Sequence, residues 1–319
     1  MSLLIKVVNN KIVNGEFRII FRGFSIADPY KLENKDKVDV NRLIKEIKEM
    51  GGNIVRIPIQ PDLWQVFPNF LERYVDKIVK SCKKHKIYCI IDWHAIGNPV
   101  KGETRMKDYF IEKKGKKYYR YESNLEICKR FWREASKRYG KEENVLFEIF
   151  NEPAPGEKDN IEKGLSALFW KEWKEKAEEI VKVIRKNSKN IILVGPIKWS
   201  YDLSKVVEYP INAENIAYSV HPYPIHKDWK NNFEKAINKL PIIVTEWAFK
   251  EVTKADFLRA TKEDYGDYIL DYMESNGIGW IAWCYDNEWG PKIFISWKKE
   301  DYTKWGKYII EKLKKITVT

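Results

Sequence analysis

Residues 145–153 read VLFEIFNEP, and this stretch indicates how the chain folds. The run from Val145 to Phe150 is mostly apolar, as is typical of a strand buried in a parallel sheet. Pro153 then ends the strand. We therefore expect Asn151 and Glu152 at the carboxyl end of a strand, which is where α/β barrels carry their functional residues.

A second stretch has the same form. Residues 241–247 read PIIVTEW, an apolar run that ends in Glu246 and Trp247. Cleavage of the bond between two sugars needs two carboxyl groups, one protonated and one ionised. Because Glu152 and Glu246 are both expected at strand ends, the residues alone lead to the hypothesis of glycoside hydrolysis.

Strand-like and helix-like segments alternate along the chain. The expected strands cover residues 22–24, 53–59, 86–94, 145–153, 191–196, 216–224, 241–247 and 277–283. The expected helices cover residues 41–50, 69–84, 123–139, 162–187, 202–208, 229–239, 263–275 and 303–315. Eight such units in 319 residues predict an α/β fold, a (β/α)8 TIM barrel that forms a single catalytic domain over residues 1–319.

Two further segments add to the predicted barrel. Residues 3–13 and 16–22 alternate around Asn14-Gly15, so residues 1–22 are expected to form a short N-terminal β-hairpin that plugs the barrel and leads into its first strand. The connection 95–122 is the longest and is rich in Lys, Gly and Tyr. It is expected either to shape a binding site or to form a surface excursion.

Composition limits the classes of function. The formal net charge is +12, but Lys and Glu are spread along the expected helices, which favours a solvated, ion-paired surface over nucleic-acid binding. The 13 Trp and 18 Tyr offer flat faces for sugar rings, although core packing also uses such residues. The four cysteines form no CxxC pair and are expected as buried free thiols.

The expected strand ends together resemble a known family. They carry polar and aromatic residues similar to the eight that family 5 glycoside hydrolases share, a family with paired glutamates on strands 4 and 7. The matching residues are Arg56, His94, Asn151, Glu152, His221, Tyr223, Glu246 and Trp283. The resemblance runs from RGF at 22–24 to WIAW at 280–283, and AWCYDNEWGP at 282–291 resembles the end of the barrel in several bacterial and archaeal endoglucanases.

The resemblance implies a role for each glutamate. Glu152 would be the general acid that protonates the leaving oxygen and then the general base for water, with its pKa raised by partial burial and a neighbouring carboxylate. Glu246 would be the nucleophile, which Arg56 and the hydroxyl of Tyr223 would keep ionised. Retention of anomeric configuration would follow if the two carboxyl groups lie roughly 5 to 5.5 Å apart.

The other members of the set would contact the substrate. Asn151 would bind the sugar 2-hydroxyl, His94 and His221 would bind hydroxyls or orient the carboxylates, and Trp283 would form the floor of the subsite at the cleaved bond. Other aromatic residues are candidates either for sugar platforms or for ordinary packing, namely Trp64, Trp93, Trp199, Trp229, Tyr285, Trp289 and Trp297. In the connection 95–122, the residues that could wall a cleft are Tyr109, Tyr118, Tyr119 and Tyr121.

Alternative interpretations stay open for single residues. Arg56 could simply pair with a buried acid such as Glu148, which lies inside its strand and is expected to be structural. A metal site of Asp92, His94 and His221 is conceivable, but it would normally need an HxH pair, and DWH supplies one histidine. Since a carboxylate pair and water suffice for the chemistry, we predict no metal and no cofactor.

These features predict a retaining endo-β-1,4-glucanase, a cellulase that hydrolyses internal bonds of a β-glucan polysaccharide or oligosaccharide by double displacement. The alternatives are a family 5 β-glycanase for mannan, glucomannan, xyloglucan or mixed-linkage glucan, and a non-catalytic carbohydrate-binding barrel. We expect a monomer without nucleic-acid or membrane partners. The substrate class predicts a secreted, extracellular protein, although the first residues lack the form of a signal peptide.

Overall fold

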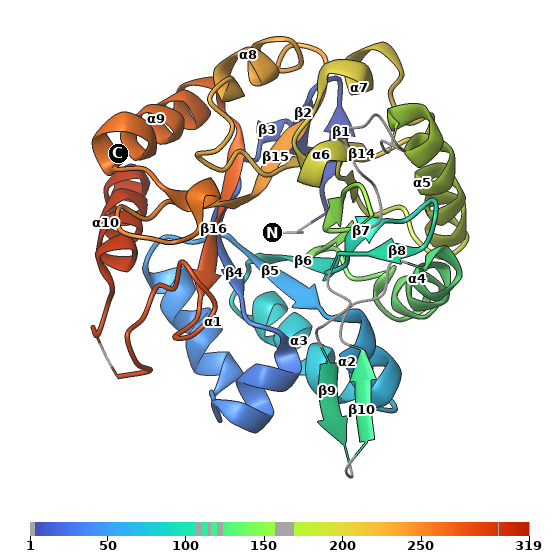
Figure 1. Ribbon diagram of the computed structural model, residues 1–319, viewed down its shortest axis with the longest axis horizontal. Coiled ribbons are helices and arrows are strands. Elements are labelled where there is room, and N and C mark those ends of the chain that lie inside the picture. Colours follow the sequence, from blue (N-terminus) through green and yellow to red (C-terminus); the bar gives the residue numbers. More distant parts are fainter. Residues whose placement is uncertain are drawn as a thin grey trace.

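The computed structural model describes residues 4–105, 110–113, 116–119, 124–156, 169–298 and 300–318. Within these ranges eight parallel strands close into a barrel, and Figure 1 shows the helices placed around it. In order around the barrel, the strands are β4 (Arg22–Ile26), β5 (Ile54–Ile59), β6 (Tyr88–Trp93), β11 (Val145–Glu148), β13 (Ile192–Val194), β14 (Ile216–Val220), β15 (Ile242–Trp247) and β16 (Gly279–Tyr285). The predicted (β/α)8 fold is confirmed.

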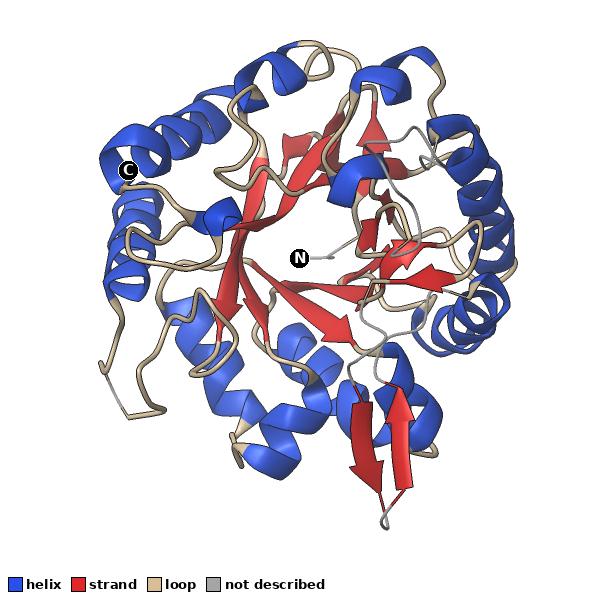
Figure 2. Cartoon of the chain, in the orientation of Figure 1, coloured by secondary structure: helices blue, strands red, loops and turns tan. Residues whose placement is uncertain are grey.

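The helices form a layer outside the strands, as Figure 2 shows. The longer ones are α1 (Val40–Glu49), α3 (Asp76–Lys84), α4 (Leu125–Tyr139), α5 (Trp170–Arg185), α9 (Asp267–Asn276) and α10 (Lys304–Val318). The shorter helices and helical turns are η1 (Lys31–Lys35), α2 (Pro61–Val66), η2 (Leu71–Val75), α6 (Ile197–Ser200), α7 (Ser204–Glu208), α8 (Trp229–Glu234), η4 (Asp256–Leu258) and η5 (Lys262–Gly266). The helix α2 was not expected, because six residues are too few to display helical periodicity.

Local sequence explains several helix ends. The side chain of Asp39 accepts hydrogen bonds from two backbone N–H groups in the first turn of α1, and Asn124 caps α4 in the same way. The helix α9 ends at Gly277, whose φ of 62° lies in the left-handed region that glycine adopts easily. Of the helix expected at 162–187, residues 162–168 lie outside the described residues, and α5 begins at Trp170.

Alternation along the barrel strands produces two apolar cores. Outward side chains pack against the helices in the larger core, whereas inward side chains form a smaller core inside the barrel. The barrel residues of the smaller core are Ile54, Tyr88, Ile90, Leu146, Leu193, Ala217, Ile243 and Ile281. Further along the same inward rows the side chains become polar, with Arg56 on β5, Asp92 on β6 and Glu148 on β11, all fully buried. The inward side chains are therefore apolar toward the amino end of the barrel and polar toward its carboxyl end.

The N-terminal segment forms a small antiparallel sheet of β1 (Lys6–Val8), β2 (Lys11–Asn14) and β3 (Phe17–Arg18). The strands β2 and β3 pair around a turn of Gly15 and Glu16, which confirms the predicted hairpin with its turn one residue later than Asn14-Gly15. Residues 3–13 do not form one strand, however. A turn at Asn9 and Asn10 separates β1 from β2, and the φ of 56° at Asn9 is one that asparagine tolerates better than most residues.

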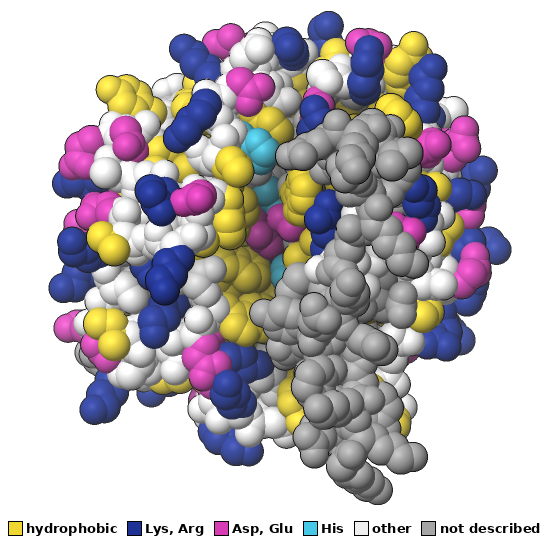
Figure 3. All heavy atoms as spheres, in the orientation of Figure 1, with side chains coloured by type: hydrophobic (Ala, Val, Ile, Leu, Met, Phe, Trp, Pro, Cys, Tyr) yellow, Lys and Arg dark blue, Asp and Glu magenta, His cyan; other side chains and the backbone are white. Residues whose placement is uncertain are grey.

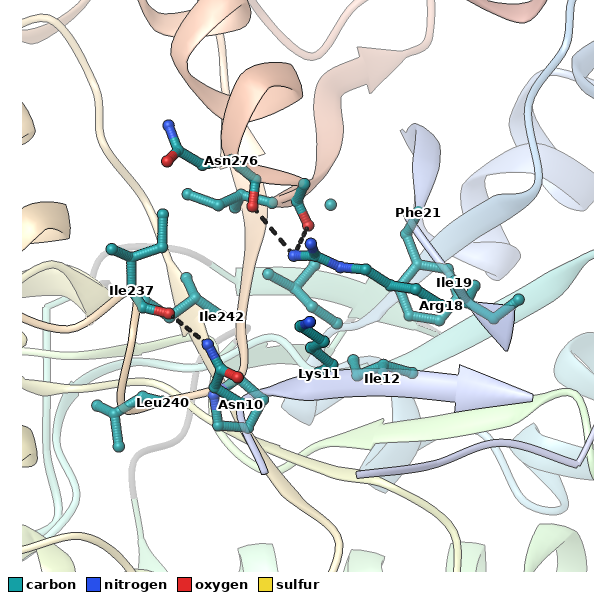
Figure 4. A pocket seen from close by; sticks show the side chains of 15 residues that line it. Asn10, Lys11, Ile12, Arg18, Ile19, Phe21, Ile237, Leu240, Ile242 and Asn276 are labelled. Atoms are coloured by element: carbon teal, nitrogen blue, oxygen red, sulfur yellow. Dashed lines mark hydrogen bonds between the residues drawn. The ribbon is translucent and has the colours of Figure 1, made fainter. Parts of the chain in front are cut away.

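This hairpin closes the amino end of the barrel. Ile5 and Ile12 belong to the same apolar core as the inward barrel residues. Figure 4 shows Arg18 reaching across a pocket, where its Nη2 donates to the backbone carbonyls of Asn276 and Gly277 at 3.0 and 2.8 Å. Because apolar side chains fill this end, a ligand must approach from the carboxyl ends of the strands.

The long connection after β6 carries four short strands, β7 (Ile96–Asn98), β8 (Glu103–Thr104), β9 (Phe110–Lys113) and β10 (Lys116–Tyr119). The strand β7 pairs with β8 and with β12 (Glu152–Pro153). The pair β9 and β10 forms a hairpin that projects beyond the ring of helices in Figure 1. The connection therefore combines both expected forms, since one part supports the Glu152 segment and the other is a surface excursion.

Two expectations from composition can also be compared with the structure. Cys82, Cys89, Cys128 and Cys284 are all buried free thiols, as predicted. Among the helices of the described ranges, none is long and apolar enough to cross a membrane.

Candidate active site

The predicted site residues meet at the carboxyl end of the barrel. Figure 3 shows a hollow in the middle of this face, where acidic and histidine side chains are visible between hydrophobic ones. Arg56, Asn151, His221 and Glu246 are buried, with at most 5% of each residue exposed. Glu152 is partly exposed, so it lies where a substrate can reach it.

Arg56 connects the acidic groups of the site. Its Nε donates to Glu148 at 2.5 Å, its Nη1 to Glu246 at 2.6 Å, and its Nη2 to Asn151 Oδ1 at 2.7 Å. The same Nη2 lies 3.0 Å from a carboxylate oxygen of Asp92. The pairing of Arg56 with Glu148 and its contact with Glu246, which the sequence left as alternatives, therefore occur together.

Glu246 lies at an irregularity in β15, where pairing with β16 shifts register between Val244 and Trp247. The hydroxyl of Tyr223 donates to Oε2 of Glu246 at 2.9 Å, and Arg56 donates to Oε1 at 2.6 Å. Burial raises the pKa of Glu246, whereas the positive charge of Arg56 lowers it. Both carboxylate oxygens accept hydrogen bonds, which favours the ionised form.

Glu152 belongs to the small sheet above the barrel. Its backbone N–H donates to the carbonyl of Ala95 at 3.1 Å, and its Oε1 lies 3.0 Å from Nδ1 of His221. An oxygen of Glu152 and an oxygen of Glu246 lie within 4.8 Å of each other. Burial raises the pKa of Glu152 well above its ordinary value, and the nearby charge of Glu246 raises it further. The protonated form of Glu152 is therefore favoured.

His221 connects Glu152 to the interior of the barrel. Its Nε2 lies 3.0 Å from the hydroxyl of Thr245, and that hydroxyl donates to Oε1 of Glu148 at 2.7 Å. Burial lowers the pKa of His221 well below its ordinary value, and the charge of Arg56 lowers it further. The ring is therefore neutral at neutral pH.

His94 belongs to an aromatic surface that is built from a stack of nearly parallel rings. Its ring stacks on Trp283 with centroids 5.5 Å apart, and Trp283 stacks on Trp289 at 5.8 Å. The Nδ1 of His94 lies 2.7 Å from Asp92. Burial lowers the pKa of His94 to about 4, with a smaller effect of Arg56, and burial raises the pKa of Asp92 to about 7 against the effect of Arg56. Nearly parallel neutral rings suit the apolar face of a sugar.

The turn α6 after β13 has an unusual backbone. Lys198, Trp199 and Ser200 have φ values of 59°, 57° and 57°, in the left-handed region that non-glycine residues rarely adopt. The hydroxyl of Ser200 donates to the backbone carbonyl of Asn151 at 2.6 Å. Trp199 is partly exposed, and the guanidinium of Arg105 lies over its ring at 5.5 Å. The turn thus holds an aromatic side chain next to the predicted catalytic segment.

Several aromatic candidates serve packing. Trp93 is fully buried against Phe131, because successive residues of β6 point to opposite sides and Asp92 points inward. Trp64 and Tyr285 also belong to the larger apolar core. These residues are therefore not sugar platforms.

The remaining aromatic candidates divide by position. All four are partly exposed. Trp229 and Trp297 pack against Tyr272 and Phe294, whereas Trp289 stacks on the site residue Trp283 and Trp199 lies under Arg105. Two of the four tyrosines of the connection, Tyr109 and Tyr121, lie outside the described residues. For the other two, Tyr118 and Tyr119, the structure describes the backbone in β10.

One group of described side chains could approach a cation. Donor atoms of Glu152, His221 and Glu246 lie within 4.8 Å of one another. Arg56 lies 2.6 Å from Glu246, however, and its positive charge opposes a second cation there. The metal site considered from DWH at 92–94 does not form such a group among the described residues. We assign no metal ligands.

Two residues of the site, Thr245 and Ser200, were not predicted from the sequence. Thr245 was not considered, although strict alternation already places it on the inward row of β15 with Ile243. The register shift in β15, which is not visible in the sequence, brings its neighbour Glu246 to the same side. Ser200 was missed because its position depends on the left-handed turn. Asp92 was considered only as a metal ligand, although its spacing of two from His94 already places both on one face of β6.

A barrel that brings two glutamates together at its open end has the form of a glycoside hydrolase. Residues 15–288 match the model of the cellulase family, glycosyl hydrolase family 5. Since this match covers most of the chain, the protein belongs to glycosyl hydrolase family 5.

Individual relatives agree with this assignment. Cellulase CelDZ1 of Thermoanaerobacterium sp. is 28% identical over 260 residues, which is 76% of this chain and 59% of the relative. Endoglucanase E-5 of Thermobifida fusca is 27% identical over 251 residues, 74% of this chain and 46% of the relative. The chain thus spans about half the length of these curated relatives.

Solved structures show the same fold. The native crystal structure of β-glucanase SdGluc5_26A from Saccharophagus degradans has a TM-score of 0.86 and 27% identity, covering 98% of this chain and 94% of that one. A structure of that β-glucanase in complex with cellotetraose has a TM-score of 0.84, with the same identity and coverage.

Proposed function

We propose that this chain is a retaining endo-β-1,4-glucanase that cleaves internal bonds of β-glucans. The observation that carries the proposal is the approach of Glu152 and Glu246, whose nearest oxygens lie within 4.8 Å. Carboxyl groups roughly 5 to 5.5 Å apart leave no room for a water between them and the sugar, so direct attack by a carboxylate is favoured.

Two displacements would then follow. In the first, Glu152 gives its proton to the glycosidic oxygen as that C–O bond breaks, and Glu246 attacks the anomeric carbon to form a glycosyl ester. In the second, Glu152 takes a proton from water, the water oxygen attacks the same carbon, and Glu246 leaves as a carboxylate. Two inversions give net retention, and neither step needs a metal or cofactor.

The neighbouring contacts support these roles. Arg56 and Tyr223 donate to the two oxygens of Glu246, which keeps it ionised and ready to attack. Asn151 uses Oδ1 to accept from Arg56, so its amide N–H groups are the ones available to donate to a sugar 2-hydroxyl. Trp283 is partly exposed on the His94 stack and offers a floor for a sugar ring.

The names of related proteins support a β-glucan substrate. Relatives from several bacteria are called cellulase or endoglucanase, and a solved relative was crystallised with cellotetraose. The buried histidines beside the aromatic surface are neutral at neutral pH, which suits an uncharged sugar polymer. We also propose a single catalytic domain over residues 1–319 that acts as an extracellular monomer.

The experiment that tests the substrate is release of reducing ends from carboxymethylcellulose, mixed-linkage glucan, glucomannan, mannan and xylan, measured side by side with Glu246→Ala as the blank. Cleavage of the glucans ahead of mannan is expected. Mannan ahead of cellulose would overturn the substrate while leaving both glutamates in place. Binding without cleavage of any polymer or short oligosaccharide would favour a carbohydrate-binding barrel.

A second candidate is a glucanase with another linkage preference. It is favoured by the solved relative with 27% identity, which is named a β-glucanase without a stated linkage. In the same assay, mixed-linkage glucan cleaved well ahead of carboxymethylcellulose would support this candidate. Proton NMR of the first product, recorded before mutarotation, would show the β-anomer in either case.

A further inference from the structure

We propose that Thr245 is a positioning residue that fixes the tautomer of His221, so that the Nδ1 lone pair faces Glu152 and holds the proton of that acid. This inference rests on the proposed function, because it concerns the group that protonates the leaving oxygen. Thr245 itself touches neither substrate nor the reacting atoms. It acts through the histidine ring.

The contacts form a continuous chain from the opening of the site into the barrel. Oε1 of Glu152 lies 3.0 Å from Nδ1 of His221, and Nε2 of the same ring lies 3.0 Å from the hydroxyl oxygen of Thr245. That hydroxyl donates to Oε1 of Glu148 at 2.7 Å. Thr245 and Glu148 are fully buried and His221 is 1% exposed, so bulk water does not replace these partners.

Only one assignment of hydrogens fits this series of hydrogen bonds. The threonine hydroxyl has one hydrogen, and because it donates that hydrogen to Glu148 it can only accept from the imidazole. Nε2 of His221 must therefore carry the ring proton. A neutral imidazole has one N–H group, so Nδ1 presents a lone pair. At 3.0 Å, Glu152 satisfies that lone pair only when it is protonated.

Charges around this series of hydrogen bonds maintain the protonation states of Glu148 and His221. Burial raises the pKa of Glu148, but Arg56 donates to it at 2.5 Å and lowers that pKa, which favours the ionised acceptor that the threonine requires. Arg56 and burial both oppose protonation of His221, so transfer of the Glu152 proton to the ring is unfavourable. The titratable groups that face the pair from the surrounding elements are Arg56, Asp92, His94, Glu148, Tyr223, His226 and Glu246.

The arrangement serves both halves of the proposed reaction. Before the first step, the lone pair of Nδ1 stabilises the acid form of Glu152 that must donate its proton. After that step, the ionised Glu152 faces the same lone pair and gains no hydrogen bond from it. The carboxylate is therefore a stronger base toward the incoming water. A ring with its proton on Nδ1 would have the opposite effect and would stabilise ionised Glu152.

The first test reads the tautomer of His221 in the wild-type protein. The chain has four histidines, so 15N NMR of ring nitrogens in the wild-type protein can be assigned, with His221→Gln identifying the signal that disappears. We expect His221 to be neutral, with the proton on Nε2 and an unprotonated Nδ1. A ring protonated on Nδ1, or a charged ring at neutral pH, would overturn the proposal.

The second test uses Thr245→Val, which removes the hydroxyl and nearly keeps the shape, with Thr245→Ser as the matched variant that keeps it. Without the hydroxyl, Nε2 has no acceptor for its proton. The tautomer with the proton on Nδ1, which donates to Glu152, then becomes favourable. The basic limb of the pH profile of kcat/KM, which reports the pKa of Glu152, should then move to lower pH by about one unit. A change of one ordinary hydrogen bond corresponds to roughly that shift in pKa. Thr245→Ser should retain the wild-type limb.

The outcomes separate this inference from the proposed function. An unmoved basic limb in folded Thr245→Val, or an equal shift in both variants, would reject the role of Thr245. If Thr245→Val does not fold, the 15N spectrum of His221 in the wild-type protein and the pH profile of Thr245→Ser still test the role of Thr245. If Glu152→Gln and Glu246→Ala both cleave polymer at the wild-type rate, the proposed function fails, whatever tautomer His221 shows.

Discussion

Glu148 and Asp92 stand opposite each other in the pairing of β11 with β6, and both contact the guanidinium of Arg56, at 2.5 and 3.0 Å. Glu246 contacts the same group at 2.6 Å. A single buried cation therefore faces several buried carboxyl groups, and its charge is divided among them. Burial raises the pKa of Asp92, and the contact with Arg56 lowers it only in part. Burial likewise raises the pKa of Glu246 against the effect of the same guanidinium.

The raised pKa of Asp92 predicts a loss of stability with rising pH. Its pKa is about 7 in the folded chain, against about 4 in an unfolded one, so the folded state binds more protons between these values. The stabilisation is fully present below pH 4 and is lost as pH rises through 7. Denaturant unfolding from pH 4 to 8 should show Asp92→Asn flattening this decline by roughly 2 to 4 kcal/mol. Asp271→Asn, on the exposed surface of α9, is the control and should leave the slope unchanged.

Removal of the nucleophile should be rescued by a small anion. Glu246→Ala is expected to lower kcat by roughly 10⁴-fold or more on an activated aryl β-glycoside. Azide should restore turnover and give an α-glycosyl azide, because it attacks from the face that the carboxylate occupied. Product NMR identifies the anomer. A β-azide would point to Glu246 as the acid/base instead.

Removal of the acid should depend on the leaving group. Glu152→Gln cannot supply a proton, so activity on polymer and on poor leaving groups should fall by roughly 10² to 10⁴-fold. Aryl glycosides with activated leaving groups should lose much less in the first step, because they depart without protonation. Steady-state kinetics on a series of aryl cellobiosides measures this, with exposed Glu175→Gln on α5 as the control. Equal losses across the series would remove Glu152 from this role.

The aromatic surface should matter for binding. Trp283→Ala removes the ring that stacks on His94 at 5.5 Å and should lower kcat/KM on cello-oligosaccharides about 5-fold, since a stacking contact is worth about 1 kcal/mol. Trp229→Ala is the matched control, because that ring packs on Tyr272 at 5.4 Å, between α8 and α9. Comparable losses in both variants would show that the effect is one of folding.

The barrel and the meeting of Glu152 and Glu246 at its carboxyl end could be predicted because they depend on short-range patterns. Alternation of strand and helix signals predicted the eight strands, and the polar residues after apolar runs predicted Glu152 and Glu246. The same alternation separates inward Asp92 from outward Trp93, and applying it strictly would have removed Trp93 from the sugar platforms.

Other parts of the site could not be predicted, because they depend on departures from regular geometry. The register shift between Val244 and Trp247 brings Glu246 to the same inward side as Thr245, and no residue type in TEW indicates this shift. The three left-handed residues at 198–200 are not glycines, so the turn that brings Ser200 to Asn151 has no sequence signal. The turn at Asn9 does have one, since asparagine tolerates this backbone, but it interrupts a longer alternating pattern that is typical of a single strand.

The amino end of the barrel, which the hairpin closes, lies opposite the hollow that holds the proposed active site. The β2–β3 turn at Gly15 is exposed, with open space around the position of a Cβ atom, and it belongs to the hairpin that fills the end opposite the hollow. A cysteine or affinity tag inserted at this turn would let the molecule be tethered to a solid carrier with the hollow facing outward. Such an immobilised catalyst would meet insoluble polymer with its open face, and the tether would not compete with the substrate for space.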